Sequence, residues 1–225
     1  MIKMYCIKKP SVRASYEELV KEVLKNGEDM ITEDGQKCRE IRNTVIEITN
    51  PKLKSISPKY PLGKKAVEQY TNNLLYGSEN VFSYDYHSRL FKYPVNNKEI
   101  NQIDFIVEKL KEQQNSRRCV AITWQPNIDI EVSNKDHGSV PCLQFVQFLI
   151  RDNKLYQTVL FRSNDLAVAF VSNALGLIAL GEMVAEKVGV DYGTYTHHSV
   201  SMHIYIDRDR DYIEKYFPES LKYLE

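Results

Sequence analysis

The sequence lacks the features of disulfide-rich, zinc-bound and membrane proteins. Its four cysteines, Cys6, Cys38, Cys119 and Cys142, form no C-x-x-C pair and no dense framework. That pattern argues against structural zinc and favours a reducing, cytoplasmic compartment. No run of about 18 apolar residues exists to cross a membrane, and no apolar stretch follows the N-terminal lysines, so we expect no secretory signal.

Net charge is also absent. Lys and Arg number 30, and Asp and Glu number 30, so the chain has no global basic field of the kind that nucleic-acid binders use. No internal repeat, linker or low-complexity tract interrupts the 225 residues, of which 43% are hydrophobic. We therefore expect one domain spanning residues 1–225.

Strands and helices are mixed without a βαβ rhythm, which predicts an α+β fold. The expected helices are 16–26, 64–76, 101–114 and one that begins at Ser172 and ends before Gly189. The expected strands are 1–7, 39–49, 119–124, 142–150, 155–161 and 199–206. Ser15 and Glu18 form a capping box at the first helix. Segments 28–37 and 127–140 read as loops.

Two of these strands predict a hairpin with chemical consequences. The turn-prone residues 151–154 separate two β-rich runs, which is typical of an antiparallel hairpin. The ends of the hairpin then place Cys142 beside Arg162. A guanidinium beside a thiol favours the nucleophilic thiolate. The alternative is a buried core cysteine, which is common in β-rich runs.

Further motifs surround this hairpin in a fixed order. They are Arg117-Arg118, Trp124-x-Pro126-x-x-Asp129, Pro141-Cys142, Gln147-Phe148, Arg162-Ser163-x-Asp165, Asn173 and His203-x-Tyr205. In order and spacing, over residues 115–205, they resemble the signature of the thymidylate synthase family, which includes the pyrimidine hydroxymethylases. The resemblance implies a mixed or antiparallel sheet flanked by helices in a two-layer sandwich.

The resemblance also implies a reaction. A methyltransferase of this kind transfers a one-carbon unit from a reduced methylene-pterin to C5 of dUMP, which yields dTMP. Cys142 would attack pyrimidine C6, because covalent attack turns the unreactive ring into an enolate that can accept the carbon at C5. The donor would be 5,10-methylenetetrahydrofolate or a modified pterin such as methylenetetrahydromethanopterin, without a metal.

Site residues follow from the same resemblance. Arg162, Ser163, Arg117 and Arg118 would bind the phosphate, and the Arg117-Arg118 pair would come from the partner subunit of a homodimer. Asp165 would meet the pyrimidine through its backbone, Asn173 would read the N3 and O4 edge, and His203 and Tyr205 would bind the ribose. Glu68 resembles the proton-relay glutamate and Tyr86 the tyrosine of a Tyr-Gly segment.

The chain departs from the family pattern at several places. Leu143 stands where His is usual and Phe161 where Gln is common. The loop 32–35 is acidic where a phosphate-binding Arg is expected, so that Arg39 or Arg42 would have to substitute. The sequence ends twenty residues after Tyr205, which leaves little room for a C-terminal closing arm. These departures favour a short, divergent, archaeal-type branch that uses a modified pterin.

Three other functions are compatible with parts of the sequence. A deoxypyrimidine-monophosphate hydroxymethylase would use the same residues and capture the intermediate with water. A non-catalytic nucleotide-binding paralogue would keep the arginines, but the presence of Cys142 argues against it. A metal hydrolase would need a metal site built from His197, His198, His203 and Asp207. Adjacent histidines in a strand point to opposite faces, which disfavours that site.

Overall fold

One mixed β-sheet forms the centre of the computed structural model, which describes residues 4–78, 85–96, 98–135 and 137–224. Its strands are β1 (Tyr5–Lys9), β2 (Glu28–Ile31), β3 (Lys37–Ile48), β6 (Val120–Ile122), β7 (Leu143–Arg151), β8 (Lys154–Phe161), β9 (Asn164–Asp165) and β10 (Asp191–Tyr205). Their order is β1-β3-β10-β8-β7-β6, with β2 on β3 and β9 on β10. β4 (Tyr93–Val95) and β5 (Lys98–Ile100) form a separate pair. Because β10 runs parallel to β8 and antiparallel to β3, the expected mixed sheet is confirmed.

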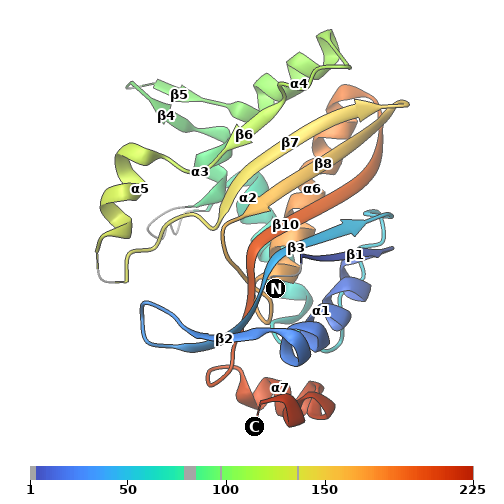
Figure 1. Cartoon of the computed structure of the whole chain (residues 1–225). Coiled ribbons are helices and arrows are strands. Elements are labelled where there is room, and N and C mark those ends of the chain that lie inside the picture. The colour runs from blue at the N-terminus through green and yellow to red at the C-terminus, as the bar shows by residue number, and fades with distance from the viewer. Residues whose placement is uncertain (1–3, 79–84, 97, 136, 225) are drawn as a thin grey trace.

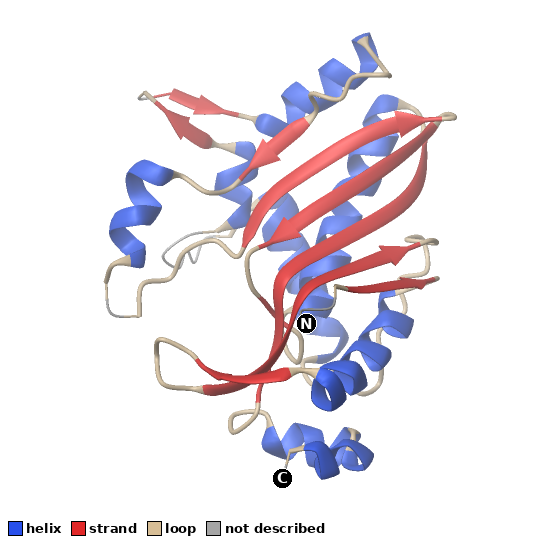
Figure 2. Cartoon of the chain, viewed as in Figure 1, coloured by secondary structure: helices blue, strands red, loops and turns tan. Residues whose placement is uncertain are grey.

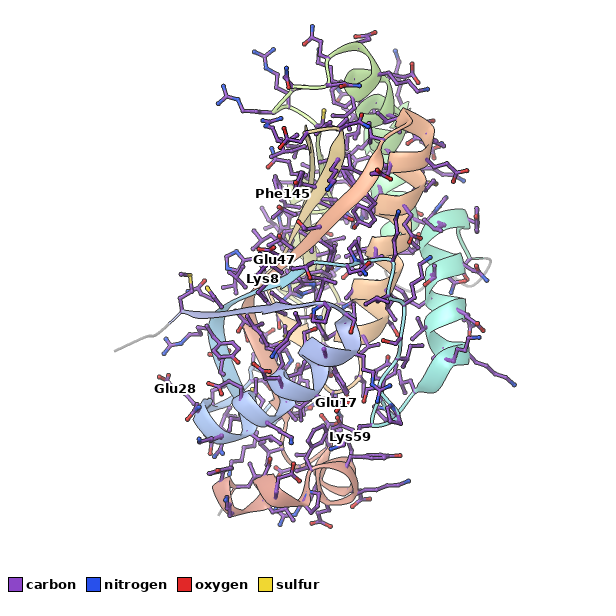
Figure 3. The ribbon with its side chains drawn as sticks, turned by 90° about the vertical axis from the view of Figure 1, so that its right-hand side faces the viewer. Lys8, Glu17, Glu28, Glu47, Lys59 and Phe145 are labelled. Carbon is purple, nitrogen blue, oxygen red and sulfur yellow. The ribbon has the colours of Figure 1, made fainter. Side chains whose placement is uncertain are left out.

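Three helices, α1 (Val12–Asn26), α2 (Gly63–Tyr76) and α6 (Phe170–Val188), form a second layer behind this sheet, whereas α5 (Pro126–Ser133) lies to its left and α7 (Arg210–Tyr216) below it in the same view (Figure 1, Figure 2). The chain also forms α3 (Tyr86–Phe91) and α4 (Gln102–Glu112), and the 3₁₀ helix η1 (Pro218–Tyr223) follows α7. Seen edge-on, α6 and α2 lie on one side of the strands (Figure 3). Within the described residues, no helix is long and apolar enough to cross a membrane.

The predicted hairpin is present as β7 and β8. Asp152 and Asn153 form its turn, both with positive φ (49° and 58°), as a two-residue type I′ turn requires. At the opposite end, Leu143 pairs with Phe161, and the Arg162 amide donates to the Cys142 carbonyl at 2.9 Å. The hairpin therefore places Cys142 and Arg162 side by side, each one residue outside its strand.

Both predicted helix caps are wrong. α1 begins before Ser15, because the Ser11 hydroxyl accepts from the Ala14 amide at 3.3 Å. Ser15 lies inside the helix and donates to the Val12 carbonyl at 2.9 Å. α6 likewise begins at Phe170, and Ser172 bonds to the Tyr60 hydroxyl at 2.8 Å. A serine within the first turn can bond to a preceding carbonyl or to a neighbouring side chain instead of capping the helix. The local sequence does not distinguish these cases.

Two segments predicted as loops contain regular structure. Residues 28–31 form β2, which is exposed along its whole length. It pairs with β3 so that Asp29 faces Arg39, and charge pairing rather than apolar alternation supports this strand. Residues 126–133 form α5, with Pro126 at the first helical position and Asp129 buried. The predicted helices 64–76 and 101–114 and the predicted strands 39–49, 119–124, 142–150 and 155–161 are confirmed with small changes at their ends. The predicted strand 199–206 is the second half of a longer strand, β10, which begins at Asp191. Of the predicted strand 1–7, residues 1–3 lie outside the described residues, and β1 runs from Tyr5 to Lys9.

Candidate functional site

A pocket of about 1300 Å³ opens where the hairpin ends meet α6 and the end of β10. The β2–β3 loop and the segment after α5 form its rim, and both approach from the same side in Figure 1. The pocket is lined by eight of the residues that the sequence nominates: Tyr86, Cys142, Arg162, Ser163, Asp165, Asn173, His203 and Tyr205. Residues scattered over 120 positions of sequence are thus brought to one cavity.

Cys142 is partly exposed at the pocket wall. The adjacent Leu143 amide donates to the Tyr86 hydroxyl at 3.1 Å, so α3 holds its tyrosine against the start of β7. Cys119 differs, since it is fully buried, and burial raises the pKa of its thiol. Of these two cysteines, only Cys142 lies where a substrate can reach it.

The Arg162 side chain braces the chain that leads into the cysteine. Its Nε donates to the Pro141 carbonyl and its Nη2 to the Val140 carbonyl, both at 3.0 Å. These bonds use two of the five N–H donors of a guanidinium. The remaining N–H groups can donate to an anion, and the planar guanidinium suits the geometry of a phosphate.

Asp165 lies on β9, which pairs with the end of β10 opposite His203. Its Oδ1 accepts from the Val168 amide at 3.3 Å. Its Oδ2 pairs with Arg208 Nη2 at 2.7 Å. Arg208 also lines the pocket. Sequence reasoning missed it, because it lies after the last of the ordered motifs, which ends at Tyr205.

His203 and Tyr205 meet at the pocket end of β10, as their spacing predicts. Their rings pack edge-to-face with centroids 5.0 Å apart. His203 Nδ1 is 3.5 Å from the Ser163 hydroxyl. Burial lowers the pKa of His203 and outweighs the opposing effect of Asp165, so the imidazole is neutral at physiological pH. Burial also raises the pKa of Tyr205. Both side chains are therefore neutral hydrogen-bonding groups.

Asn173 lies near the start of α6 and is 6% exposed. Its backbone amide donates to the Ala169 carbonyl at 2.9 Å, which fixes the first turn, and the residue borders the pocket. An amide side chain offers both donors and an acceptor. At this position it can read an edge that carries both kinds of group.

Three nominated residues do not line this pocket. Glu68 is exposed on α2 and pairs with Lys64 at 3.3 Å. Arg117 and Arg118 are exposed between α4 and β6. The Arg117 carbonyl accepts from Gln147 Nε2 at 3.0 Å, which fixes the pair beside the sheet rather than in its own chain's cavity.

The acidic loop contributes to the pocket, and the arginines expected to replace its cation do not. Arg39 pairs with Asp29 and Arg42 with Glu28, each at 2.5 Å, and neither lines the cavity. Glu33 and Asp34 do line it, together with Lys135 and His137 on the facing segment. Asp34 Oδ1 lies 3.0 Å from His137 Nδ1, so the two rims touch across the opening.

A buried ion pair that the sequence did not reveal joins α3 to α5. Arg89, on α3, binds Asp129 through Nη2 at 2.7 Å and through Nη1 at 3.1 Å. The same Nη1 reaches the Thr123 carbonyl at 3.1 Å. The pair ties α3, and with it Tyr86, to α5. The only sequence signal is the place of Asp129 in the Trp124 motif.

The histidines considered for a metal site do not converge. His197 is fully buried and stacks on Phe161 at 4.6 Å, whereas the adjacent His198 lies on the opposite face of β10. Across the part of the chain that the structure describes, no three His, Cys, Asp or Glu side chains cluster as a metal site would require.

Comparison with known proteins agrees with these motifs. The family model described as "Thymidylate synthase" matches residues 65–217. A protein from Methanocaldococcus jannaschii is 70% identical over 221 residues, which cover 98% of this chain and 100% of that protein. A Methanosarcina mazei protein is 39% identical over 191 residues, or 84% of this chain and 83% of its own. Both bear the name "Putative thymidylate synthase". Similarity to archaeal proteins confirms the expected branch.

Proposed function

This chain belongs to the thymidylate synthase family, and on that premise we propose that it methylates dUMP to dTMP with a reduced methylene-pterin. One observation carries the proposal: Cys142, with Arg162 fixed beside it, faces a cavity that also presents Asn173, His203 and Tyr205. A nucleophile, a phosphate-binding cation and groups for a base and a sugar are thus combined in one pocket. We place the reaction in the cytoplasm.

The proposed chemistry begins at the Cys142 sulfur. Its thiolate forms a bond to pyrimidine C6, and the ring electrons move to O4 as an enolate. C5 would then attack the methylene carbon as one of its two carbon–nitrogen bonds to the donor opens, and C5 would lose its proton. The second carbon–nitrogen bond would break to leave a methylene group on C5. Hydride from the pterin, which is oxidised in the step, would complete the methyl group as the sulfur leaves C6. Covalent attack divides one difficult substitution into easier steps.

Other side chains hold the nucleotide in register with that sulfur. Arg162 and Ser163 bind the phosphate, and the Asp165 backbone meets the base. Asn173 donates to O4, where the charge develops, and accepts from N3–H. His203 and Tyr205 bind the ribose as neutral partners. We assign a proton-transfer role to Tyr86, and its hydrogen bond from the Leu143 amide, next to Cys142, supports that role. The exposed position of Glu68 lends no support to such a role.

The size of the cavity supports two substrates. Sites for a single small ligand occupy about 300–1000 Å³, and this pocket measures about 1300 Å³. A nucleotide at the hairpin ends would leave space toward the rim formed by the β2–β3 loop and the segment after α5. We assign that space to the pterin.

We propose a homodimer that uses the uncovered face of the sheet. Phe145, Leu160, His198 and Val45 are neighbours across β7, β8, β10 and β3, and each is only half-buried. Phe145 lies on the side of the sheet away from α6 (Figure 3). A contiguous surface of this kind, in which three apolar side chains adjoin one histidine, is typical of an interface. Arg117 and Arg118 lie beside it, where they would reach the partner's pocket.

Product analysis tests the proposal. The protein is incubated with dUMP and either methylenetetrahydrofolate or methylenetetrahydromethanopterin, and the nucleotides are separated by chromatography with mass detection. We expect dTMP with at least one donor. A 5-hydroxymethyl product would instead identify the hydroxymethylase, in which water replaces hydride. Tight dUMP binding without any product would indicate the non-catalytic paralogue.

A further inference from the structure

We propose that Arg208 is a positioning residue that fixes the Asp165 carboxylate and the Tyr205 ring on the base-and-ribose side of the pocket. The inference rests on the proposed function for the identity of the nucleotide. It assigns a task to a side chain beyond the motifs of the sequence. Arg208 acts through its neighbours, so it differs in kind from the groups that touch the substrate.

Arg208 bonds to Asp209, which fixes its guanidinium, and to Asp165, which borders the pocket. Its Nε and Nη2 bind the two carboxylate oxygens of Asp209, each at 2.7 Å, which is the bidentate geometry that gives an Arg–carboxylate pair its orientation. The same Nη2 reaches Asp165 Oδ2 at 2.7 Å. Asp209 is 7% exposed and precedes α7, so the guanidinium is fixed to a helix start before it meets the pocket.

The guanidinium also covers an aromatic ring. Its central carbon lies 4.4 Å from the centroid of Tyr205, a favourable cation–π distance. Tyr205 in turn packs edge-to-face on His203. One side chain therefore fixes the Asp165 carboxylate and the Tyr205 ring, and through that ring it also supports His203.

The acidic residues of the pocket explain why Asp165 needs a cationic partner. The proposed substrate carries a phosphate, and Glu33, Asp34 and Asp165 all line the pocket. An unpaired carboxylate beside an anion raises the free energy of the complex. Because Arg208 pairs with Asp165, that carboxylate presents less negative potential and keeps one orientation. Three hydrogen bonds already occupy Arg208, which favours positioning over direct phosphate binding.

The first test needs no nucleotide. The charged groups facing His203 are Asp165, Glu40 and Arg208, of which Arg208 lowers its pKa and the two carboxylates raise it. We expect Arg208→Ala to raise the pKa of His203 in an NMR titration of histidine-labelled protein. Arg210→Ala is the matched control, because Arg210 pairs with exposed Glu214 at 3.0 Å and lies outside the pocket lining. Thermal unfolding checks that each variant folds.

The second test measures coupling in binding. Arg208→Ala should weaken dUMP binding about tenfold in calorimetry, because Asp165 loses its charged hydrogen-bond partner and is left unpaired beside the nucleotide. Arg208→Lys should recover part of the loss. In an Asp165→Asn background, Arg208→Ala should cost much less, because the carboxylate that it holds is gone. Equal losses in both backgrounds would overturn the proposal.

The two tests fail separately. If wild-type protein does not bind dUMP, the proposed function is wrong, and the His203 titration still decides whether Arg208 organises the pocket. If dUMP binds but Arg208→Ala leaves both the His203 pKa and the affinity at wild-type values, the positioning role is wrong and the proposed function stands.

Discussion

Two buried polar side chains, Asn173 and His197, differ in whether their hydrogen bonds can be completed. Asn173 is 6% exposed and borders the cavity, so a ligand can complete its hydrogen bonds. His197 is fully buried between aromatic rings. Its Nδ1 bonds to the Tyr195 hydroxyl at 2.9 Å, but its Nε2 has no partner among the described residues. Asn173 can therefore bind a ligand, whereas burial of the unpaired His197 nitrogen destabilises the folded state.

Asn173→Asp should move binding preference from dUMP toward dCMP. An amide can donate to O4 and accept from N3–H, whereas a carboxylate can only accept, which suits the 4-amino group of cytosine. An edge contact of this kind is worth about 1–3 kcal/mol. Calorimetry with both nucleotides should show the ratio of dissociation constants shifting about tenfold. An unchanged ratio would show that Asn173 does not read the ring.

His197 should make the protein sensitive to acid. Burial, reinforced by neighbouring His198, lowers its pKa from 6.5 to about 3, so the unfolded chain binds this proton more readily. The stability contribution of the neutral ring is complete above pH 6.5 and is lost as the pH falls toward the folded value. For His197→Phe, which can keep the stacking on Phe161, denaturant titrations should show a smaller loss between pH 6 and pH 4, by about 2 kcal/mol. Parallel pH curves for both proteins would contradict this assignment.

At the scale of elements, α6 packs so closely on the sheet that a glycine is required. A Cβ at Gly181 would collide with Gln157 Oε1 and the Tyr192 hydroxyl, two buried groups that bond to each other. Gly181→Ala should therefore lower the free energy of unfolding by about 1–3 kcal/mol, although alanine is the better helix former by about 1 kcal/mol. The control, Glu186→Ala on the exposed face, should stay within about 0.5 kcal/mol. A stabilised Gly181→Ala protein would show that Gln157 and Tyr192 can move aside without loss of stability.

Elements with a strong local signal were predictable from sequence. The central hairpin follows from its β-rich runs and turn, and α4 from its apolar stripe. β2 and α5 were not predicted, because both depend on partners that are distant in the sequence. Asp29 of β2 pairs with Arg39, and Asp129 of α5 binds Arg89. The same limit applies to the site. Cys142 and Arg162 could be paired through the hairpin, but Arg208 and Arg89 gain meaning only from the groups that they meet in space.

At the scale of the whole molecule, the site is proposed to be complete only in a dimer. A Cys142→Ser chain and an Arg117→Ala/Arg118→Ala chain should each be nearly inactive alone. A mixed dimer has one pocket with both the cysteine and the arginine pair and one pocket with neither. Random pairing should therefore restore roughly a quarter of wild-type activity. No recovery on mixing, or an active monomer in sedimentation, would refute the shared site.

The central claim is that the Cys142 sulfur bonds to C6 of the pyrimidine, and intact-protein mass spectrometry tests it most directly. The protein is incubated with 5-fluoro-dUMP and either methylenetetrahydrofolate or a methanopterin analogue. The fluorine blocks loss of the C5 substituent, so the adduct should accumulate with nucleotide and pterin both attached, and peptide mapping should place it on Cys142. Cys142→Ser should give no adduct, and Cys119→Ser should give the full amount. An adduct on another residue, or none with either donor while 5-fluoro-dUMP binds, would contradict the account.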